Sequence, residues 1–356
     1  MPSTPDLFVS GYTEEGYGAG PGLAGFRLLP DGTVGEQVGA SAAVRNPSFV
    51  IAAGGVLLAV EELPQGNLLA LDRQDLNILG RLSTGGADPC HVAFADGTVW
   101  AANYSSGSAA VLSLADLLAN TVSEPKLVAH PGSGPVPGRQ GQSHAHQVTA
   151  TPWGTALVAD LGADRVDEYA LAGGNELLGS AQLPPGTGPR HVALKGDFLL
   201  VAGELDGCVH VLRRTVHGGD HYWHWLFKTV LAENTEARDE EFYPSHIELS
   251  GDGSKLYAAV RGPNTLVVLD VAGLPASADT DQTPTPPVFL RQVASGGNWP
   301  RHFALGSHGG GSGKLYVANQ LSNNVAVFDL DADGLPGAFP VQSLDFGSPT
   351  CILLHR

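Results

Sequence analysis

One short motif recurs along this chain at intervals that are typical of a closed ring of similar units. The stretch GPRHVAL at 188–194 returns as WPRHFAL at 299–305. Relatives of its Pro-x-His core occur in seven places, and they align on the following residues: Phe49, His91, His146, His191, His246, His302 and Cys351. The intervals are 42, 55, 45, 55, 56 and 49 residues. A period near 50 of strand-like material indicates a β-propeller.

A second apolar segment follows each of the first six motifs, usually after a short turn. Examples are VWAANY at 99–104, LLVAGE at 199–204 and LYVANQ at 315–320. A third segment such as NVAVFDL at 324–330 comes next. These runs are short, rich in β-branched residues and bounded by turn residues, and the chain's 47 glycines and 25 prolines suit many such turns. Each unit is therefore predicted to be one blade of three clear strands and a weaker outer strand.

The two ends of the chain complement each other. The seventh motif, PTCILLHR at 349–356, has no second segment after it, whereas LFVSGY at 7–12 matches the second segment of the other units. We therefore expect the last blade to be closed by one C-terminal strand pairing with three N-terminal strands, which leaves no exposed edge. The prediction is an all-β, seven-bladed β-propeller forming a single domain over residues 1–356.

Composition excludes several partners and compartments. The net charge of −17 argues against nucleic acid and acidic membrane surfaces. The N-terminus MPSTPDLFVS has neither a basic nor an apolar signal region, and no window approaches ~18 uninterrupted apolar residues. The three cysteines cannot all pair and form no CxxC motif, so we interpret them as reduced thiols. We expect a soluble, cytoplasmic protein that is a monomer or weak dimer.

Equivalent positions of the blades should form rings around the central channel. The aligned ring contains five histidines among its seven residues. One residue earlier, Arg190 and Arg301 replace the small residues of most other blades, and Asn103, Glu204 and Arg261 lie where second segments end. Converging ionisable groups are the default candidate for an active site. Two alternatives stay open: the histidines could cap blades structurally, and the arginines could pair with acidic neighbours.

Metal binding is not expected. The His144-x-His146 pair lacks a third local ligand, and the oxygens of Glu61, Asn103 and Asp160 are the better alternative for a cation. Long loops on a rigid scaffold often shape a binding site. Segments 130–144 and 214–243 are therefore predicted to form its walls, with HYWHW at 221–225 as a packed flap.

Several of these segments together resemble one family. They are SHAHQV, DLGADRVDEY, GPRHVAL, YPSHIELSGDG with AAVRG, and NWPRHFAL with LYVANQ. Their order and blade positions are similar to those of the seven-bladed β-propeller lactonases. That family includes propeller 6-phosphogluconolactonases and a fungal carboxy-cis,cis-muconate cyclase. The resemblance covers nearly the whole chain, from LFVSGYT to PTCILL.

The resemblance implies a catalytic cluster of one histidine, two arginines and one glutamate. By motif the arginines are Arg190 and Arg261 and the glutamate is Glu204. The histidine is one of the HAH pair, His146 on the ring or His144 just outside it, and His146 is the first candidate. The ring positions add candidate substrate-binding residues: His144, His191, His246, Arg301, His302 and Asn103. No cofactor is implied.

The expected activity is hydrolysis of a sugar lactone, with 6-phosphogluconolactone as the first candidate for a small anionic substrate. Glu204 or His146 would act as general base on water, and Arg190 and Arg261 would offset developing negative charge. The net charge of −17 opposes long-range attraction of an anion, although salt screens that field and a local arginine pair can dominate. A carboxymuconate cyclase-like enzyme and a non-catalytic propeller that binds a partner through its top face are the alternatives.

Overall fold

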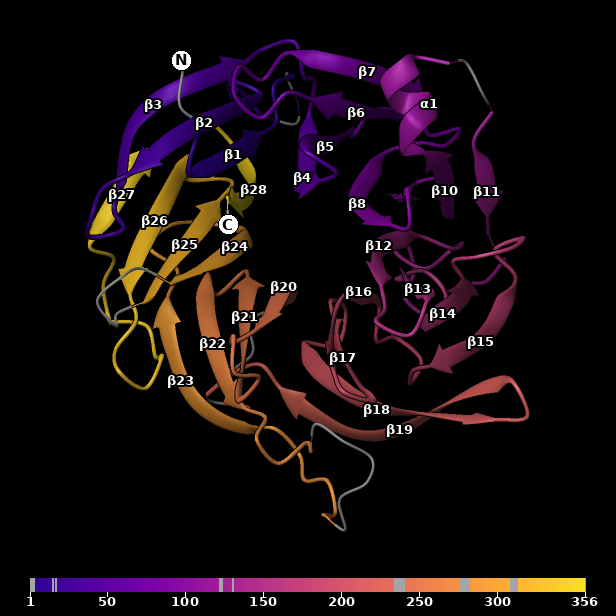
Figure 1. The fold of residues 1–356 in the computed structure, drawn as a ribbon. Helices are drawn as coiled ribbons and strands as arrows, with labels where there is room; N and C mark the ends of the chain where they lie inside the picture. Colours follow the sequence, from indigo (N-terminus) through magenta and orange to yellow (C-terminus); the bar gives the residue numbers. More distant parts are fainter. Residues whose placement is uncertain are drawn as a thin grey trace.

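Seven blades surround a central axis in the computed structural model (Figure 1). The structure describes residues 4–14, 16, 18–121, 124–129, 131–233, 241–275, 282–307 and 313–355. Within these residues the strands form seven four-stranded antiparallel sheets. The predicted all-β, seven-bladed propeller is confirmed, including the weaker fourth strand of each blade.

The first and last strands lie side by side in one blade. Strand β28 (Pro349–Leu354) pairs with β1 (Leu7–Gly11), and β2 (Leu23–Leu28) and β3 (Val34–Ser41) complete the sheet. Ser10 and Thr350 share a side-chain hydrogen bond of 2.9 Å across this joint. The ring is therefore closed by hydrogen bonds between the two chain ends, as predicted.

The other six blades follow in chain order, each from its innermost to its outermost strand. They are β4 (Pro47–Ala53), β5 (Val56–Glu61), β6 (Asn67–Leu71) and β7 (Ile78–Ser83); β8 (Pro89–Ala95), β9 (Thr98–Asn103), β10 (Ser108–Ser113) and β11 (Lys126–Val128); β12 (Ala145–Ala150), β13 (Thr155–Asp160), β14 (Arg165–Ala170) and β15 (Leu177–Gln182); β16 (Pro189–Lys195), β17 (Phe198–Gly203), β18 (Cys208–His217) and β19 (Asp220–Val230); β20 (Tyr243–Leu249), β21 (Lys255–Arg261), β22 (Thr265–Asp270) and β23 (Val288–Ala294); β24 (Pro300–Ser307), β25 (Gly313–Asn319), β26 (Asn324–Asp329) and β27 (Gln342–Asp345).

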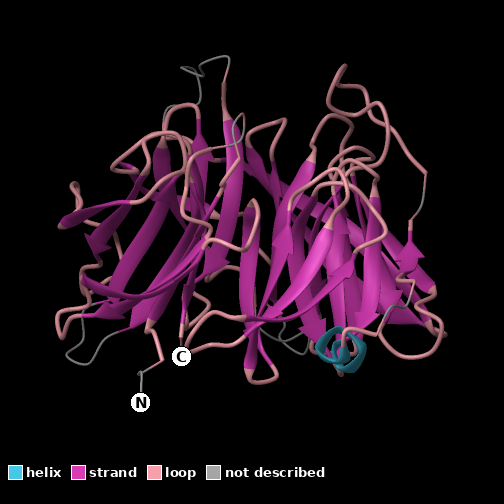
Figure 2. Ribbon diagram, turned by 90° about the horizontal axis from the view of Figure 1, so that it is seen from above, coloured by secondary structure: helices cyan, strands magenta, loops and turns pink. Residues whose placement is uncertain are grey.

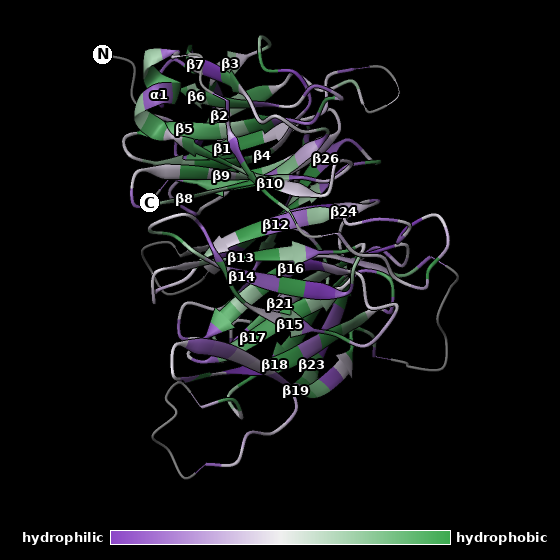
Figure 3. Cartoon of the chain, turned by 90° about the vertical axis from the view of Figure 1, so that its right-hand side faces the viewer, coloured by the Kyte–Doolittle hydropathy of each residue, from purple (hydrophilic) through white to green (hydrophobic). Residues whose placement is uncertain are grey.

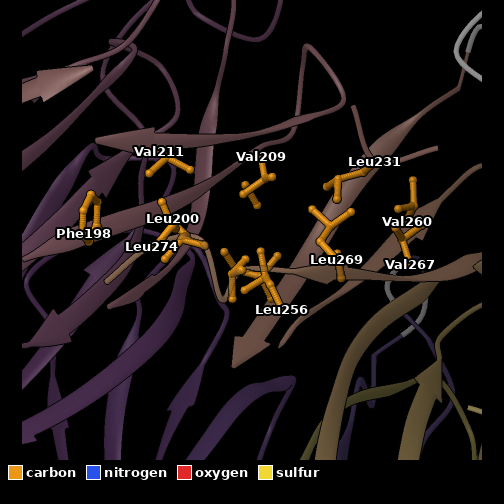
Figure 4. Close-up of a cluster of buried hydrophobic side chains, with 14 residues drawn as sticks. Phe198, Leu200, Val209, Val211, Leu231, Leu256, Val260, Val267, Leu269 and Leu274 are labelled. Atoms are coloured by element: carbon orange, nitrogen blue, oxygen red, sulfur yellow. The ribbon is translucent and has the colours of Figure 1, made fainter. Parts of the chain in front are cut away.

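The hydrophobic core lies between neighbouring blades. Second strands such as β5, β13 and β17 are buried along their whole length, because each blade packs against another sheet on both faces. One cluster joins Leu200 and Val209 to Leu256 and Val267 of the next blade (Figure 4). Hydrophobic colouring accordingly runs along the strands, and the loops are more polar (Figure 3). Repeated sheet-on-sheet packing thus holds the blades around the axis.

A β-bulge recurs at the motif that opens each innermost strand. In β16 the register shifts between Pro189 and Val192, so that Arg190 and His191 have no regular partners on β17. The same shift occurs at the Pro-x-His positions of β8 and β24. A bulge re-aims side chains that regular alternation would send to opposite faces. It therefore allows two successive residues of each motif to face the channel.

Two features differ from the sequence-based expectation. A short helix, α1 (Leu114–Ala119), lies between β10 and β11 and is capped by the Ser113 side chain. Segment 214–243 was predicted to wall the site, but its described part largely extends β18 and β19 into a long hairpin at the outer edge of the ring (Figure 1). HYWHW lies within β19, so that prediction was wrong for residues 214–233; residues 234–240 lie outside the described part.

The joint between the chain ends can be tested with Ile352→Ala. Ile352 is only 2% exposed in a core shared by the first and last strands. Its truncation should lower the free energy of unfolding by about 2–4 kcal/mol in urea titrations. The control is Leu127→Ala on the outer strand β11, where the side chain is 46% exposed and the change should stay within about 0.5 kcal/mol. Equal effects of the two substitutions would contradict a stabilising joint.

Candidate active site

A small polar cavity lies at the end of the channel where innermost strands begin and second strands end. Its volume is about 180 Å³. The connecting loops gather at the two faces of the ring (Figure 2). The cavity lies at one of these faces, since Glu62, Tyr104 and Glu204 of its lining each follow a second strand. Its lining consists of Glu62, Cys90, Tyr104, Arg139, His146, Arg190, Glu204, Arg261 and Arg301.

Glu204 is the electrostatic centre of this cavity. The residue directly follows β17, and its side chain is 5% exposed. Its Oε2 lies 2.7 Å from Nη2 of Arg261 and 2.9 Å from Nε of Arg190, while its Oε1 accepts a hydrogen bond from Arg139. The Arg261 contact is an aligned hydrogen bond, whereas the Arg190 contact is an ion pair without that alignment. Three arginines from different segments therefore converge on one carboxylate.

A second charged group completes the lining on another side. Arg301 lies 3.3 Å from Glu62 Oε2, and its guanidinium stacks 5.0 Å from the centre of the Tyr12 ring. The Tyr12 hydroxyl donates to the same Glu62 oxygen at 2.8 Å. With one carboxylate here and one at Glu204, the lining holds four arginines against two glutamates. The cavity is thus locally cationic within a chain of net charge −17.

The protonation states follow from burial and these neighbours. Burial by itself would raise the pKa of Glu204, but the surrounding arginines, Arg261 and Arg190 first, hold that pKa well below its usual range. Burial, followed by the charge of Arg190, lowers the pKa of His146 well below 6.5. Burial and the charge of Arg261 lower the pKa of Arg190 to about 9. At neutral pH the cavity therefore presents an ionised carboxylate, a neutral imidazole and charged guanidiniums.

Aromatic rings close the channel below the cavity. His191 and His246 meet through their Nδ1 atoms at 2.8 Å, and His246 stacks on His302 with ring centres 4.0 Å apart. Phe49 lies against His91 at 4.0 Å. Only about 10 Å³ of space remains between this ring and the arginines above it, which is at the lower limit for one water molecule. A ligand therefore has to enter the cavity from the face of the ring at which the second strands end, called the loop face below.

The structure brings together all four residues predicted for catalysis. His146, Arg190, Glu204 and Arg261 all line the cavity, and so does Arg301. The open question between the two histidines of the HAH motif is also answered. His146 faces the cavity, whereas His144 lies behind Tyr104, stacked on its ring at 4.6 Å.

Other predicted substrate-binding residues lie elsewhere. His191, His246 and His302 belong to the closing ring below the cavity. Asn103 is fully buried outside the cavity, where its amide donates to Ser108 Oγ at 3.2 Å and to the carbonyl oxygen of Thr84 at 3.4 Å. Asn103 is still paired within β9, whereas the next residue, Tyr104, follows the strand and lines the cavity. The prediction for Asn103 is therefore corrected.

Sequence reasoning missed four residues of the lining, which are Glu62, Cys90, Tyr104 and Arg139. Cys90 occupies the ring position of Arg190 and Arg301. Tyr104 and Glu62 occupy the same position after a second strand as Glu204, and this register was the available signal for them. Arg139 comes from loop 131–144, which was predicted to be a wall of the site, but no repeat position marks it. Blade register can identify strand residues, whereas a residue on an irregular loop has no counterpart in other blades.

Of the three side chains considered for a cation, Glu61 and Asp160 have oxygens engaged in structural contacts, whereas Oδ1 of Asn103 is buried without a hydrogen-bond partner within the described part of the chain. Glu61 pairs with Arg81 at 3.0 Å, and Asp160 Oδ1 accepts backbone N–H groups of His144, Gly162 and Ala163. Among the described residues, no group of three or more His, Cys, Asp or Glu side chains could hold a metal ion. Nor does this part of the chain contain a helix of the length and apolarity needed to cross a membrane.

The family model described as lactonase, 7-bladed beta-propeller matches residues 6–354, and the chain belongs to this family. The resemblance noted in the sequence is thereby confirmed.

Named relatives have related activities. The chain is 29% identical to the 6-phosphogluconolactonase of Bacillus subtilis, with 98% of each chain covered. Among solved structures, a Pseudomonas aeruginosa periplasmic gluconolactonase superposes with a TM-score of 0.81 at 27% identity, covering 98% of both chains. A putative 6-phosphogluconolactonase of Bacteroides fragilis gives a TM-score of 0.80 at 25% identity, covering 97% of this chain and 96% of that one.

The buried histidines should make the fold sensitive to acid. Burial lowers the pKa of His91 and His302 to about 3, whereas an unfolded histidine titrates near 6.5. Below that pH the unfolded chain binds protons that the folded chain does not, so stability present above pH ~6.5 is lost as pH falls. We expect each such histidine to lower the free energy of unfolding by about 1.4 kcal/mol per pH unit below pH ~6.

Urea titrations at several pH values between 7.5 and 5 test this slope. His302→Phe, which copies Phe49 of another blade, should reduce the dependence of the free energy of unfolding on pH by about 1.4 kcal/mol per pH unit, the contribution of one proton. His217→Gln, at an exposed position of β18, is the matched control. A free energy of unfolding that does not change over this pH range would refute the expectation.

Proposed function

We propose that this chain is a lactonase that hydrolyses a sugar lactone bearing an anionic group, with 6-phosphogluconolactone as the first candidate. The observation that carries the proposal is the convergence of four arginines on a small cavity that also holds a neutral histidine. Its volume of about 180 Å³ is below the ~300–1,000 Å³ typical of sites for larger ligands. The family and the named relatives support a lactone as the substrate.

Local charge supports an anionic substrate. Long-range attraction would be weak because the chain as a whole carries −17. Within the cavity the arginines outnumber the carboxylates by four to two. Fields of buried groups are screened by salt much less than those of surface charges, so this local excess acts where the ligand binds.

His146 is the better candidate for the general base. Its imidazole is neutral at pH 7 because its pKa is lowered by burial, so its free nitrogen can accept a proton from water. Glu204 is ionised, but both of its oxygens are already occupied by arginines. We assign Glu204 the role of holding Arg190 and Arg261 in place.

In the proposed reaction, a water molecule adds to the lactone carbonyl carbon while His146 takes one of its protons. Arg190 and Arg261 donate to the oxyanion that forms, which is where preorganised donors contribute most. The ring carbon–oxygen bond then breaks, and the protonated imidazole returns the proton to the leaving alkoxide. The product is a hydroxy acid, which ionises in water, and no cofactor takes part.

Two alternatives from the sequence remain outcomes of the test. A cyclase acting on a carboxymuconate would also use a cationic cavity, and a non-catalytic propeller would bind an anion without turnover. A cytoplasmic location stays a prediction, and one of the compared structures is that of a periplasmic gluconolactonase. The expectation of a monomer or weak dimer stays a prediction too.

The assay is hydrolysis of 6-phosphogluconolactone and of gluconolactone, followed by acid release with the spontaneous rate subtracted. Arg190→Ala should lower kcat/KM by about 10²-fold or more, because it removes an oxyanion donor. Arg73→Ala, which changes an arginine at the opposite mouth of the channel, should leave the rate within about threefold. Wild-type protein without activity on either lactone would refute the proposal, and loss of carboxymuconate absorbance would favour the cyclase.

A further inference from the structure

We propose that Arg139 is the residue that selects lactones carrying a phosphate group outside the ring over unphosphorylated ones. This inference rests on the proposed function, because it assigns the two ends of the substrate to different parts of the same cavity. Arg139 belongs to no repeated motif and comes from the loop between β11 and β12. Its role is specificity, and the reacting carbonyl is assigned to other residues.

The loop holds Arg139 in a fixed place over the cavity. The next residue, Gln140, is completely buried, and its amide nitrogen donates to the Leu161 carbonyl at 2.9 Å and to Asp164 at 2.7 Å. Its amide oxygen accepts the backbone N–H of Val136 at 3.1 Å. These bonds anchor the loop beside the arginine, so that its guanidinium reaches Glu204.

Exposure separates Arg139 from the other two arginines around Glu204. Its side chain is 35% exposed, compared with 3% for Arg190 and 8% for Arg261. Arg190 is also tied to the Ser245 carbonyl oxygen, and Arg261 to that of Tyr243 at 3.3 Å. Arg139 is therefore the one of these three that stands at the entrance, and the other two lie deeper.

The closed floor of the channel fixes how a lactone can lie. Space below Arg190 is about 10 Å³, so the substrate has to enter from the loop face and cannot pass through. Its carbonyl carbon must reach His146, which is 7% exposed. The phosphate is carried by the exocyclic carbon, which is separated from the carbonyl carbon by the ring oxygen and one ring carbon. It then lies toward the entrance and Arg139.

Arg139 has the chemistry to bind this group. A guanidinium donates two parallel hydrogen bonds to a phosphate, and such charge-assisted bonds are among the stronger ones in proteins. Arg139 can turn from Glu204 Oε1 to the ligand while Arg190 and Arg261 remain at Oε2. The carboxylate thus keeps two partners when the third arginine moves to the phosphate.

Arg139→Gln tests the proposal through the ratio of kcat/KM for 6-phosphogluconolactone to kcat/KM for gluconolactone. We expect kcat/KM for 6-phosphogluconolactone to fall about 10- to 100-fold, mostly through KM, while kcat/KM for gluconolactone changes less than about threefold. Arg139→Lys should recover part of the loss, since it keeps the charge without the planar fork. The control is Arg45→Gln, which breaks another partly exposed Arg–Glu pair, with Glu14, outside the cavity and should leave both values unchanged.

Product binding supplies a second readout that does not need turnover. Calorimetry with 6-phosphogluconate and with gluconate should show that Arg139→Gln weakens the first much more than the second. An equal loss for the phosphorylated and unphosphorylated compounds would overturn the inference and leave the proposed function intact. A wild-type protein that hydrolyses neither lactone would refute the proposed function, and the calorimetric ratio would still decide the role of Arg139.

Discussion

The pairing of the last strand with the first is the constraint on which the site depends. Hydrogen bonds between β28 and β1 close the ring, and a closed ring of seven sheets aims equivalent residues of every blade at one axis. A propeller without this joint would leave two sheet edges open and its innermost strands free to separate. Residues as distant in sequence as Glu62 and Arg301 meet at the cavity because the ring is closed.

Departure from regular strand geometry converts this scaffold into a binding site. The bulge at each Pro-x-His motif allows Arg190 to face the cavity while His191 helps to close the channel beneath it. Charge then organises the cavity: Glu204 draws three arginines together, and burial keeps His146 neutral. Buried charges of like sign are tolerated only beside a compensating partner, so the carboxylate is what makes this concentration of guanidinium groups possible.

Sequence reasoning could predict the fold and the strand-borne part of the site. The repeat period predicts the number of blades, the incomplete seventh unit predicts the closure, and the motifs identify Arg190, Glu204 and Arg261. Side-chain direction was harder, because a single step of register separates Asn103, which is buried outside the cavity, from Tyr104, which lines it. Arg139 could not be predicted from periodicity, since its position depends on how an irregular loop is anchored by Gln140. The long β18–β19 hairpin was mistaken for a flap, because its polar and aromatic residues alternate on an outer strand that packs on one side only.

The central claim is that the cavity binds a small anion on the axis despite the acidic character of the whole chain. A crystal structure with 6-phosphogluconate, the hydrolysed form of the candidate substrate, tests this claim most directly. The account predicts that the sugar acid occupies the cavity, with its carboxylate between Arg190, Arg261 and His146 and its phosphate at the entrance. An unoccupied cavity at saturating ligand, or a ligand bound only at the opposite mouth of the channel, would contradict it.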